Sequence, residues 1–346
     1  MSDAVKAELL LPSALGPAEL DVWHAFMKAE PDLTRAFLSP EFALACEQAF
    51  GRVEVAIFHQ AGEILGFFPF QFESGAKAVL RSAVRIGGEL CDNAGLIARP
   101  GFAIPPTRLL KLCRLSALYV THLTQSQTAR GLQAEDAEVG HLIDLSEGSA
   151  AYFTELSLRE QEFVGDTRRR QRRASEALGE MRFETLKAAS AGDALTIIER
   201  KRRQYARTKT KDPFGQPGNT RLIEALIATA SKQCQPIIHR LSAEQGVIAQ
   251  HLGLGCGSCL NYWFPVYDPA VGSFAPGRLL LWSILENAEM AGIRLIDRGA
   301  GDTPAKRSFS NAQQMLGRAL WTTGRPNSYL PRVLRSLRWR LDRPKG

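Results

Sequence analysis

Apolar residues recur along this chain at helical spacing in some segments and gather in short strand-like runs in others. This difference predicts where its helices and strands lie. Within residues 17–28, Leu20, Trp23 and Met27 recur at helical spacing, which predicts a helix with one buried side. Residues 53–60 are instead a short run of β-branched, aromatic and other apolar residues, which predicts a strand. The first half of the chain therefore contains both helices and strands.

Turn and cap residues place the ends of these elements. Ser39 precedes Pro40 and Glu41, a combination typical of a helix start, and Gly51 is a helix stop. Ala61 and Gly62 join two strand-like runs and predict a hairpin. The first half is expected to hold helices at 17–28, 40–50 and 105–116, strands at 7–13, 53–60, 63–73, 118–125 and 139–146, and mixed strand and loop at 80–100.

The second half repeats this order of elements, although its sequence identity to the first half is slight. It is expected to hold a basic helix at 156–178, a strand at 181–187, helices at 192–207 and 220–232, three strands over 236–268, a helix from Pro276, a strand at 292–299 and a basic helix after Pro331. We therefore predict an α/β (α+β) fold of two domains, 1–148 and 149–346. Each is a mixed, largely antiparallel sheet flanked by helices.

Length and composition agree with a globular protein of two domains. The chain has 346 residues, 45% of them apolar and 23% charged, which leaves little room for extended disorder. The longest apolar runs fall short of the roughly 18 residues that a membrane span needs, and the N-terminus does not resemble a signal peptide. Six cysteines without a dense framework fit reduced thiols. We expect a cytoplasmic protein.

The formal charge of +7 is unevenly distributed. Residues 157–211 hold fifteen Lys/Arg against eight Asp/Glu, and residues 325–346 hold seven against one, so the remainder is mildly acidic. Such basic segments favour an anionic partner (a phosphorylated donor, a nucleic acid or a membrane surface), or they are solvated helix faces. The C-terminal segment has the pattern of an interfacial membrane helix and equally of a helix packed on its own domain.

Pro276, Gly277, Arg278 and Leu279 open the predicted helix that follows the strand ending at Tyr267. The first amides of a helix lack internal partners, and the helix dipole places partial positive charge there. Gly277 would let a phosphate approach the backbone, and Arg278 would add a charged donor. This turn is a candidate seat for a diphosphate, or simply a helix start.

Two stretches of the chain resemble a known family. Residues 251–311, which include PGRLLLW, and residues 37–70 are similar to the two halves of the CelD-like acyltransferases, a branch of the GNAT superfamily linked to bacterial polysaccharide biosynthesis. That family is related to the Fem ligases, which have two GNAT-like folds in tandem. The resemblance implies two tandem GNAT-like domains and an acyl-CoA donor, most simply acetyl-CoA, at the turn 276–279.

The resemblance has two departures at its functional motifs. The pyrophosphate loop of the superfamily, Gln/Arg-x-x-Gly-x-Gly/Ala, is absent, and Val271-Gly272 and Pro276-Gly277 stand in its place. Ala305 stands where the family has an aromatic residue before the loop lysine, Lys306 in this chain.

Acyl transfer needs a proton acceptor, a stabilised oxyanion and two substrates held together. His251 is a candidate general base, because its ordinary pKa is near neutrality, or else a core histidine. Tyr262 and Tyr267 are candidate proton donors to the departing thiolate, or packing residues. The Cys256-x-x-Cys259 pair has no second pair nearby and predicts a hairpin turn rather than a metal site.

Polar residues also follow the strand at 292–299. Asp297 and Asp302 flank a Gly-rich loop, and Asp302 is a candidate for orienting an acceptor amine or hydroxyl, or a turn residue. Lys306 and Arg307 are candidates for binding an anionic acceptor or the donor phosphates, or parts of a solvated loop. No metal is expected.

These observations predict a GNAT-type acyltransferase that transfers an acyl group, most simply acetyl, from CoA to an amine or hydroxyl of a small or sugar-linked acceptor. Two alternatives remain open. An aminoacyl-tRNA-dependent Fem-like ligase would use the basic segment 157–211 to contact RNA. A non-catalytic GNAT-fold module of a polysaccharide system would use the basic C-terminal segment for peripheral contact with the inner face of the membrane.

Overall fold

The computed structural model describes residues 4–187 and 189–324, which form two compact units. The first unit runs to Glu138 and resumes at Met315, and the second is Val139–Gln314. The sequence predicted a single seam between 148 and 149. The structure differs because the strand that begins at Ala312 pairs with a strand of the first unit, a long-range contact that local patterns do not reveal.

The first unit is a sheet in the strand order β1-β2-β3-β4-β6-β13 with helices between its strands. Its strands are β1 (Lys6–Leu10), β2 (Val53–Gln60), β3 (Glu63–Gln71), β4 (Ser82–Val84), β5 (Ile97–Ala98), β6 (Ala117–Leu123) and β13 (Ala312–Thr322). Its helices are α1 (Pro17–Ala29), α2 (Pro40–Phe50), α3 (Gly75–Val79), α4 (Pro106–Leu112) and α5 (Ser126–Ala129), with the short 3-10 turns η1 (Pro12–Ala14), η2 (Pro31–Leu33), η3 (Ala36–Leu38) and η4 (Gly88–Leu90).

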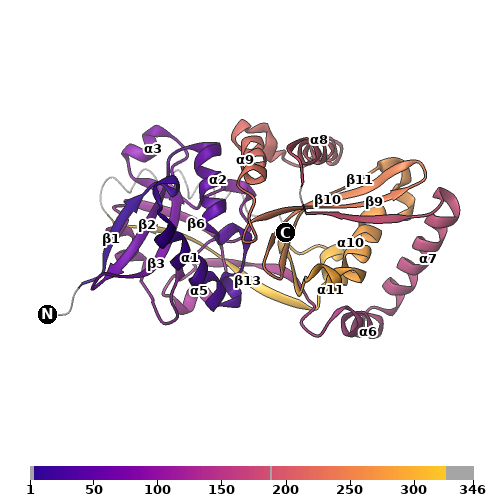
Figure 1. Ribbon diagram of the computed structural model, residues 1–346, viewed down its shortest axis with the longest axis horizontal. Helices are drawn as coiled ribbons and strands as arrows, with labels where there is room; N and C mark the ends of the chain where they lie inside the picture. The colour runs from indigo at the N-terminus through magenta and orange to yellow at the C-terminus, as the bar shows by residue number, and fades with distance from the viewer. Residues whose placement is uncertain (1–3, 188, 325–346) are drawn as a thin grey trace. The chain divides into compact units, whose positions relative to one another are not determined.

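The second unit is a sheet in the order β7-β12-β11-β10-β9-β8. Its strands are β7 (Asp136–Asp144), β8 (Arg182–Leu186), β9 (Gln235–Ala243), β10 (Gly246–Cys256), β11 (Cys259–Tyr267) and β12 (Leu295–Ala300). Its helices are α6 (Ser149–Arg159), α7 (Gln161–Leu178), α8 (Ala191–Thr208), α9 (Pro217–Ala228), α10 (Pro276–Glu286), α11 (Ala288–Ala291) and α12 (Pro304–Phe309), with turns η5 (Pro213–Gly215) and η6 (Pro269–Phe274). Helices α8 and α9 cover one face of the β9–β11 sheet and α10 covers the other (Figure 1).

The two sheets share one topology, which confirms the predicted repeat. In each unit the neighbouring strands are antiparallel except for one parallel pair, β4 with β6 and β11 with β12. The last strand of each sheet comes from elsewhere in the chain. Strand β13, near the C-terminus, pairs with β6, and β7, which follows the first unit, pairs with β12. The predicted mixed, largely antiparallel sheets flanked by helices are therefore confirmed.

Local signals fix several element ends as predicted. The Ser39 hydroxyl accepts a hydrogen bond of 3.1 Å from the Phe42 amide at the start of α2, and Gly51 ends this helix at a φ of 61°. Trp23 of α1 stacks on Phe67 of β3, with ring centroids 4.6 Å apart, so the apolar side of the helix lies on the sheet.

Other element predictions differ from the structure. The single helix expected at 156–178 is two helices, because Glu160 leaves the helical region at φ −131° and ψ 49°. Strand β13 and helix α12 were expected to be loop. The basic helix predicted after Pro331 lies outside the described residues. Within 4–187 and 189–324, no helix has both the length and the apolarity to cross a bilayer.

Candidate donor and acceptor sites

The parallel strands β11 and β12 are paired over only a short stretch. Their register runs from Cys259 opposite Leu295 to Asn261 opposite Asp297. Strand β11 then continues to Tyr267, close to the start of α10, while β12 continues to Ala300. In the part of the chain that the structure describes, no register pair joins the two strands beyond Asn261. The two strands therefore part, and each presents a backbone edge beyond that point.

Strand β11 bulges where the pair parts. Leu252 of β10 lies opposite Phe264 but Leu254 lies opposite Asn261, so β11 has one extra residue at Tyr262 and Trp263. Bulges free backbone groups from the ladder and re-aim side chains. Here the Trp263 amide donates a hydrogen bond of 3.0 Å to Nε2 of His251 on β10.

His251 is held on both ring nitrogens. Its Nδ1 lies 3.1 Å from Nδ1 of His239, and its ring stacks on Tyr262 at 4.1 Å. Because Nε2 accepts from an amide, the ring proton is on Nδ1 and is donated to His239. Burial, with help from His239 and Lys201, holds the pKa of His251 well below its usual range. This geometry makes His251 a support for the bulge, and we do not retain the predicted general-base role in the proposal below.

At the start of α10, Gly277 has no side chain to cover its backbone. Ala275, which precedes the helix, adopts a left-handed conformation (φ 54°, ψ 55°), and its carbonyl accepts from the amides of Arg278 and Leu279 at 2.9 and 3.2 Å. Pro276 and Leu279 are buried. Gly277 is half-buried, and a Cβ there would lie 3.7 Å from the Tyr267 ring. A ligand would therefore meet this turn at Gly277.

Arg278 points to helix α7 and away from the role predicted for it. Its guanidinium lies 2.8 Å from Asp166 and covers the Phe163 ring at 4.5 Å. Asp166 also holds Arg169 and Arg170, and Arg170 donates to the Ser273 carbonyl at 2.7 Å. Hydrogen bonds from these arginines, Arg170 foremost, lower the pKa of Asp166 to about 2. Three cations on one carboxylate leave net positive charge beside the turn.

Tyr267 lies at the far end of β11 and belongs to this turn. Its side chain is 38% exposed, and the guanidinium of Arg207, from the last turn of α8, lies 6.0 Å from its ring. The second tyrosine, Tyr262, is buried in the ring stack, where burial raises its pKa to about 12 and makes it a weaker proton donor.

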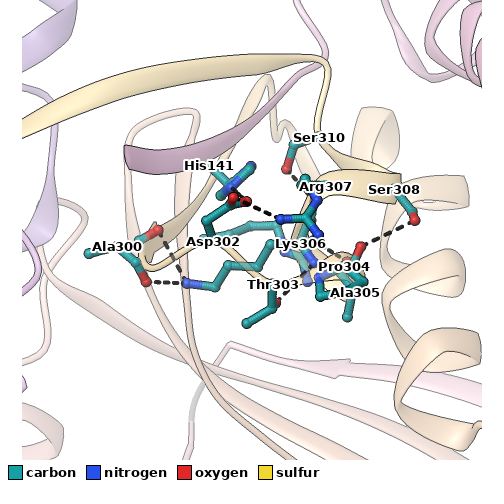
Figure 2. A network of polar contacts seen from close by, with 12 residues as sticks. His141, Ala300, Asp302, Thr303, Pro304, Ala305, Lys306, Arg307, Ser308 and Ser310 are labelled. Atoms are coloured by element: carbon teal, nitrogen blue, oxygen red, sulfur yellow. Dashed lines mark hydrogen bonds and ion pairs between the residues drawn. The ribbon is translucent and has the colours of Figure 1, made fainter. Parts of the chain in front are cut away.

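The loop after β12 forms a separate polar network (Figure 2). Asp302 accepts a hydrogen bond of 3.0 Å from Nε2 of His141 on β7 and pairs with Arg307 at 2.7 Å. The hydrogen bond from Arg307, then that from His141, holds the pKa of Asp302 below its usual range. The His141 side chain is fully buried, whereas that of Asp302 is 52% exposed. The loop thus presents an ionised, fixed carboxylate.

Lys306 and Arg298 tie this loop to its strand. Nζ of Lys306 donates to the carbonyls of Gly299 and Ala300 at 3.2 and 2.5 Å (Figure 2). Arg298 donates to the carbonyls of Ala305 and Lys306 in the first turn of α12, both at 3.0 Å. The beginning of the loop is therefore closed by its own side chains.

Asp297 lies at the last position of β12 that pairs with β11, and it is 1% exposed. Its carboxylate accepts from the Gly299 amide at 2.8 Å and from Gln314 at 3.1 Å. These contacts shape the turn after the strand, so the predicted contact of Asp297 with substrate stays a prediction that its burial does not favour.

The predicted site residues thus fall into two groups. Tyr267 and the turn 276–279 lie together, and Asp302, Lys306 and Arg307 lie together in the loop after β12. Among the described residues, no hydrogen bond or ion pair joins either group to His251. Patterns in the sequence did not identify Asp166, or His141, which contacts Asp302 across 161 positions. Neither has a local signal, because each acts through a partner that only the fold brings near. The hairpin turn predicted at Cys256 and Cys259 is present, with the two residues opposite each other.

Comparison with known proteins agrees with this geometry. Residues 162–307, which lie within the second unit, match the model of the acetyltransferase (GNAT) domain. No curated protein matches the chain. The narrower CelD-like assignment is not confirmed by these comparisons. In the described residues, no group of three or more His, Cys, Asp or Glu side chains is placed to hold a metal ion.

Solved structures share the fold over nearly the whole chain. FemX aligns with a TM-score of 0.62 at 11% identity, covering 94% of this chain and 99% of its own. L-PGS from Bacillus licheniformis aligns with a TM-score of 0.54 at 9% identity, covering 94% and 97%. A tandem GNAT protein from the clavulanic acid biosynthesis pathway aligns with a TM-score of 0.52 at 11% identity, covering 93% and 99%. At these identities the likeness shows the fold, which is that of tandem GNAT proteins.

Proposed function

We propose that the chain is an acyl-CoA-dependent N- or O-acyltransferase that moves an acyl group, most simply acetyl, to a small or sugar-linked acceptor. The observation that supports this most directly is the parted strand pair. Strand β11 leaves β12 after Asn261 and continues as an edge to the start of α10. An extended ligand can add to such an edge while its anionic end meets the helix N-terminus.

The residues at this edge fit a diphosphate-bearing donor. Gly277 gives access to the backbone at the helix start, and the neighbouring Asp166 cluster carries more arginines than carboxylates. Arg207 adds a further cation over Tyr267. We assign Gly277, Tyr267 and Arg207 to the phosphate end of the donor. Pro276, Arg278 and Leu279, which the sequence also suggested, hold the turn in shape.

The acceptor belongs at the loop after β12 in this proposal. Asp302 is ionised and fixed by His141 and Arg307, so it can accept a hydrogen bond from an amine or hydroxyl and orient it. Its lowered pKa suits binding and orientation more than proton removal. Arg307, which is half-exposed, is available to an anionic group of the acceptor. The resemblance to CelD-like proteins suggests a sugar-linked acceptor in polysaccharide biosynthesis.

The reaction is direct transfer in a ternary complex. When bound, acyl-CoA supplies the thioester, and the acceptor's lone pair forms the new bond while the carbon–sulfur bond breaks and the acceptor proton ends on sulfur. The chain's contribution is to hold the two substrates at neighbouring strand ends and to keep Asp302 charged. All six cysteines are buried, which disfavours a covalent route through sulfur.

Calorimetric titration of acetyl-CoA into the full chain tests the proposal. Gly277→Glu places a carboxylate at the phosphate position and should weaken binding about 100-fold, or ~3 kcal/mol. Gly277→Ala is the matched control, because its Cβ would make ordinary contact with Tyr267, and it should bind within a few-fold of the parent. Equal affinity of the folded Gly277→Glu variant would exclude this donor site.

A second candidate is an aminoacyl-tRNA-dependent ligase. It is favoured by the exposed arginines of α7, which are Arg168, Arg169, Arg172 and Arg173. This function predicts tRNA binding that weakens steeply with salt and no heat on titration with acetyl-CoA. Absence of binding to either donor would instead indicate a non-catalytic module. Contact with a membrane through the C-terminal segment concerns residues outside the described ones.

A further inference from the structure

Lys201 is a buried amine that the proposed mechanism does not use. It lies on α8, is 9% exposed, and donates from Nζ to the Pro265 carbonyl on β11 at 3.0 Å. A weaker contact at 3.4 Å joins it to Gln204 of its own helix, and its Nζ lies 5.3 Å from the Tyr205 ring. Among the described residues, no carboxylate lies within ion-pairing distance of this ammonium group, which is unusual for a buried lysine.

The carbonyl that Lys201 contacts belongs to the edge where the donor is proposed to bind. Pro265 lies opposite His251 of β10 and has no backbone N–H, so this pair cannot exchange both ladder hydrogen bonds. In the non-hydrogen-bonded pairs of an antiparallel ladder, the N–H and C=O groups of each residue point away from the partner strand. The Pro265 carbonyl therefore points to the edge of β11 that β12 has left, and Lys201 lies at that edge.

The order of groups along this edge is relevant to what Lys201 would meet. Gly277 and Tyr267 mark the phosphate end of the proposed donor site, and Asn261 marks the point where the strands part. Pro265 lies between Tyr267 and Asn261. A donor that extends from its phosphates toward the parting thus brings its acyl end past the Lys201 amine.

Burial lowers the pKa of Lys201 to about 8, so a much larger fraction of it is neutral near pH 7 than of an exposed lysine. The titratable groups that face it are Tyr205 on its own helix and His251 on β10, and burial keeps His251 uncharged. Neither opposes deprotonation of the amine. A neutral lysine amine is a nucleophile, whereas an ammonium group is not.

From this placement we infer that Lys201 is a site of self-acylation by the thioester donor. The Nζ lone pair attacks the thioester carbonyl carbon, the carbon–sulfur bond breaks, and the proton lost from nitrogen ends on the CoA sulfur. The products are an Nζ-acyl lysine and free CoA. Because the amide is stable, this is a dead-end modification and not an intermediate of transfer. It leaves the acyl group on the donor edge and should weaken further donor binding. The inference rests on the proposed function.

Mass spectrometry of the full chain incubated with acetyl-CoA tests the self-acylation of Lys201. Peptide mapping should find Lys201 acetylated at least about tenfold faster than the exposed Lys209, because the neutral fraction of Lys201 is larger. The rate at Lys201 should level off above about pH 8. Excess free CoA should suppress acetylation of Lys201 and leave acetylation of Lys209 unchanged. Lys201→Arg should remove the modification at this position alone.

Three results would overturn the inference: no preference for Lys201, a rate at Lys201 that free CoA does not change, or a rate at Lys201 that keeps rising well above pH 8. The Gly277→Glu and Gly277→Ala titrations separate the two proposals. If acetyl-CoA binds at Gly277 but Lys201 is unmodified, only the self-acylation is wrong. If acetyl-CoA does not bind and acetylation is random, both are wrong.

Discussion

The two parallel strand pairs of this molecule begin alike and end differently. In the first unit, β4 pairs with β6 from Ser82 opposite Ala117 to Val84 opposite Tyr119. In the second unit, β11 pairs with β12 over an equally short register. Beyond this point β11 runs on as a strand to the start of α10, whereas β4 ends at once.

The chain of the first unit returns to close its own opening. The Ala94 amide donates to the His122 carbonyl at 2.9 Å, and Ala94 bridges Leu123 in parallel at the far end of β6. The following residues, Ile97 and Ala98, pair with β3 as β5. The buried side chain of Gln127 holds both backbone groups of Leu96. In the first unit, the backbone of residues 94–98 therefore lies beside the strands where the second unit has side chains.

In the second unit the same edges are satisfied by side chains, which can move. Lys201 donates a hydrogen bond to the Pro265 carbonyl, and Lys306 donates to carbonyls of β12. His251 accepts a hydrogen bond from the Trp263 amide. A repeated topology can thus provide one closed and one accessible strand pair. This difference explains why we place the donor in the second unit alone.

The largest expected effect comes from the buried imidazole pair that supports the open strand. Burial lowers the pKa of His239 to about 4, and that of His251 also lies well below 6.5. The unfolded chain binds these protons and the folded one does not, so stability is full above about pH 6.5 and falls as the pH drops toward 4. Between pH 7 and 5, His239 alone should remove about 2 kcal/mol of stability, and the loss at His251 adds to it.

Urea unfolding followed by tryptophan fluorescence at the two pH values measures this loss. His239→Phe, which keeps a ring against Phe183, should remove about half of the pH dependence. An equal dependence in the variant would show that the imidazole pair is not buried and neutral as described.

A smaller effect is expected from opening the closed pair of the first unit. A Cβ on Gly95 would lie 2.3 Å from the Gln127 amide carbon, so Gly95→Ala must displace the side chain that holds Leu96. Loss of these buried hydrogen bonds should lower the free energy of unfolding by about 2–3 kcal/mol. Gly75→Ala, which meets no neighbouring atom, should be nearly neutral. Acetyl-CoA affinity should stay unchanged in both variants, and a loss of affinity in Gly95→Ala would place the donor in the first unit.

The smallest effect is expected at the exposed end of the open strand. Arg207→Ala removes the cation over Tyr267 and should weaken acetyl-CoA binding about three-fold at low salt. The difference should shrink as salt is raised, because exposed charges are screened. Arg203→Ala, an exposed arginine of the same helix, is the control and should have no effect. Equal binding by both variants at low salt would remove Arg207 from the site.

The sequence predicted most of the elements because their signals are local. The Ser39 cap, the Gly51 stop and the three strands over 236–268 each depend on neighbouring residues, and they appear as expected. The exchange of β13 and β7 between the sheets was not predictable, since strand pairing depends on contacts across most of the chain.

The candidate site was predicted in part for the same reason. The residues of the Gly277 turn are close together in the sequence, and so are Asp302 and Arg307. Each of these two groups stays together in the structure. The direction of the Arg278 side chain is set by Asp166 on another helix, and the orientation of Asp302 by His141 on another strand. No local pattern in the sequence contains these partners.

Hydrogen–deuterium exchange of the full chain, with and without saturating acetyl-CoA, tests whether the donor binds along the edge of β11. We expect slower exchange in residues 262–279, at the edge of β11 and the start of α10, and no change in residues 82–98 of the first unit. Protection of residues 82–98, or no protection of 262–279 while the ligand is bound, would contradict it.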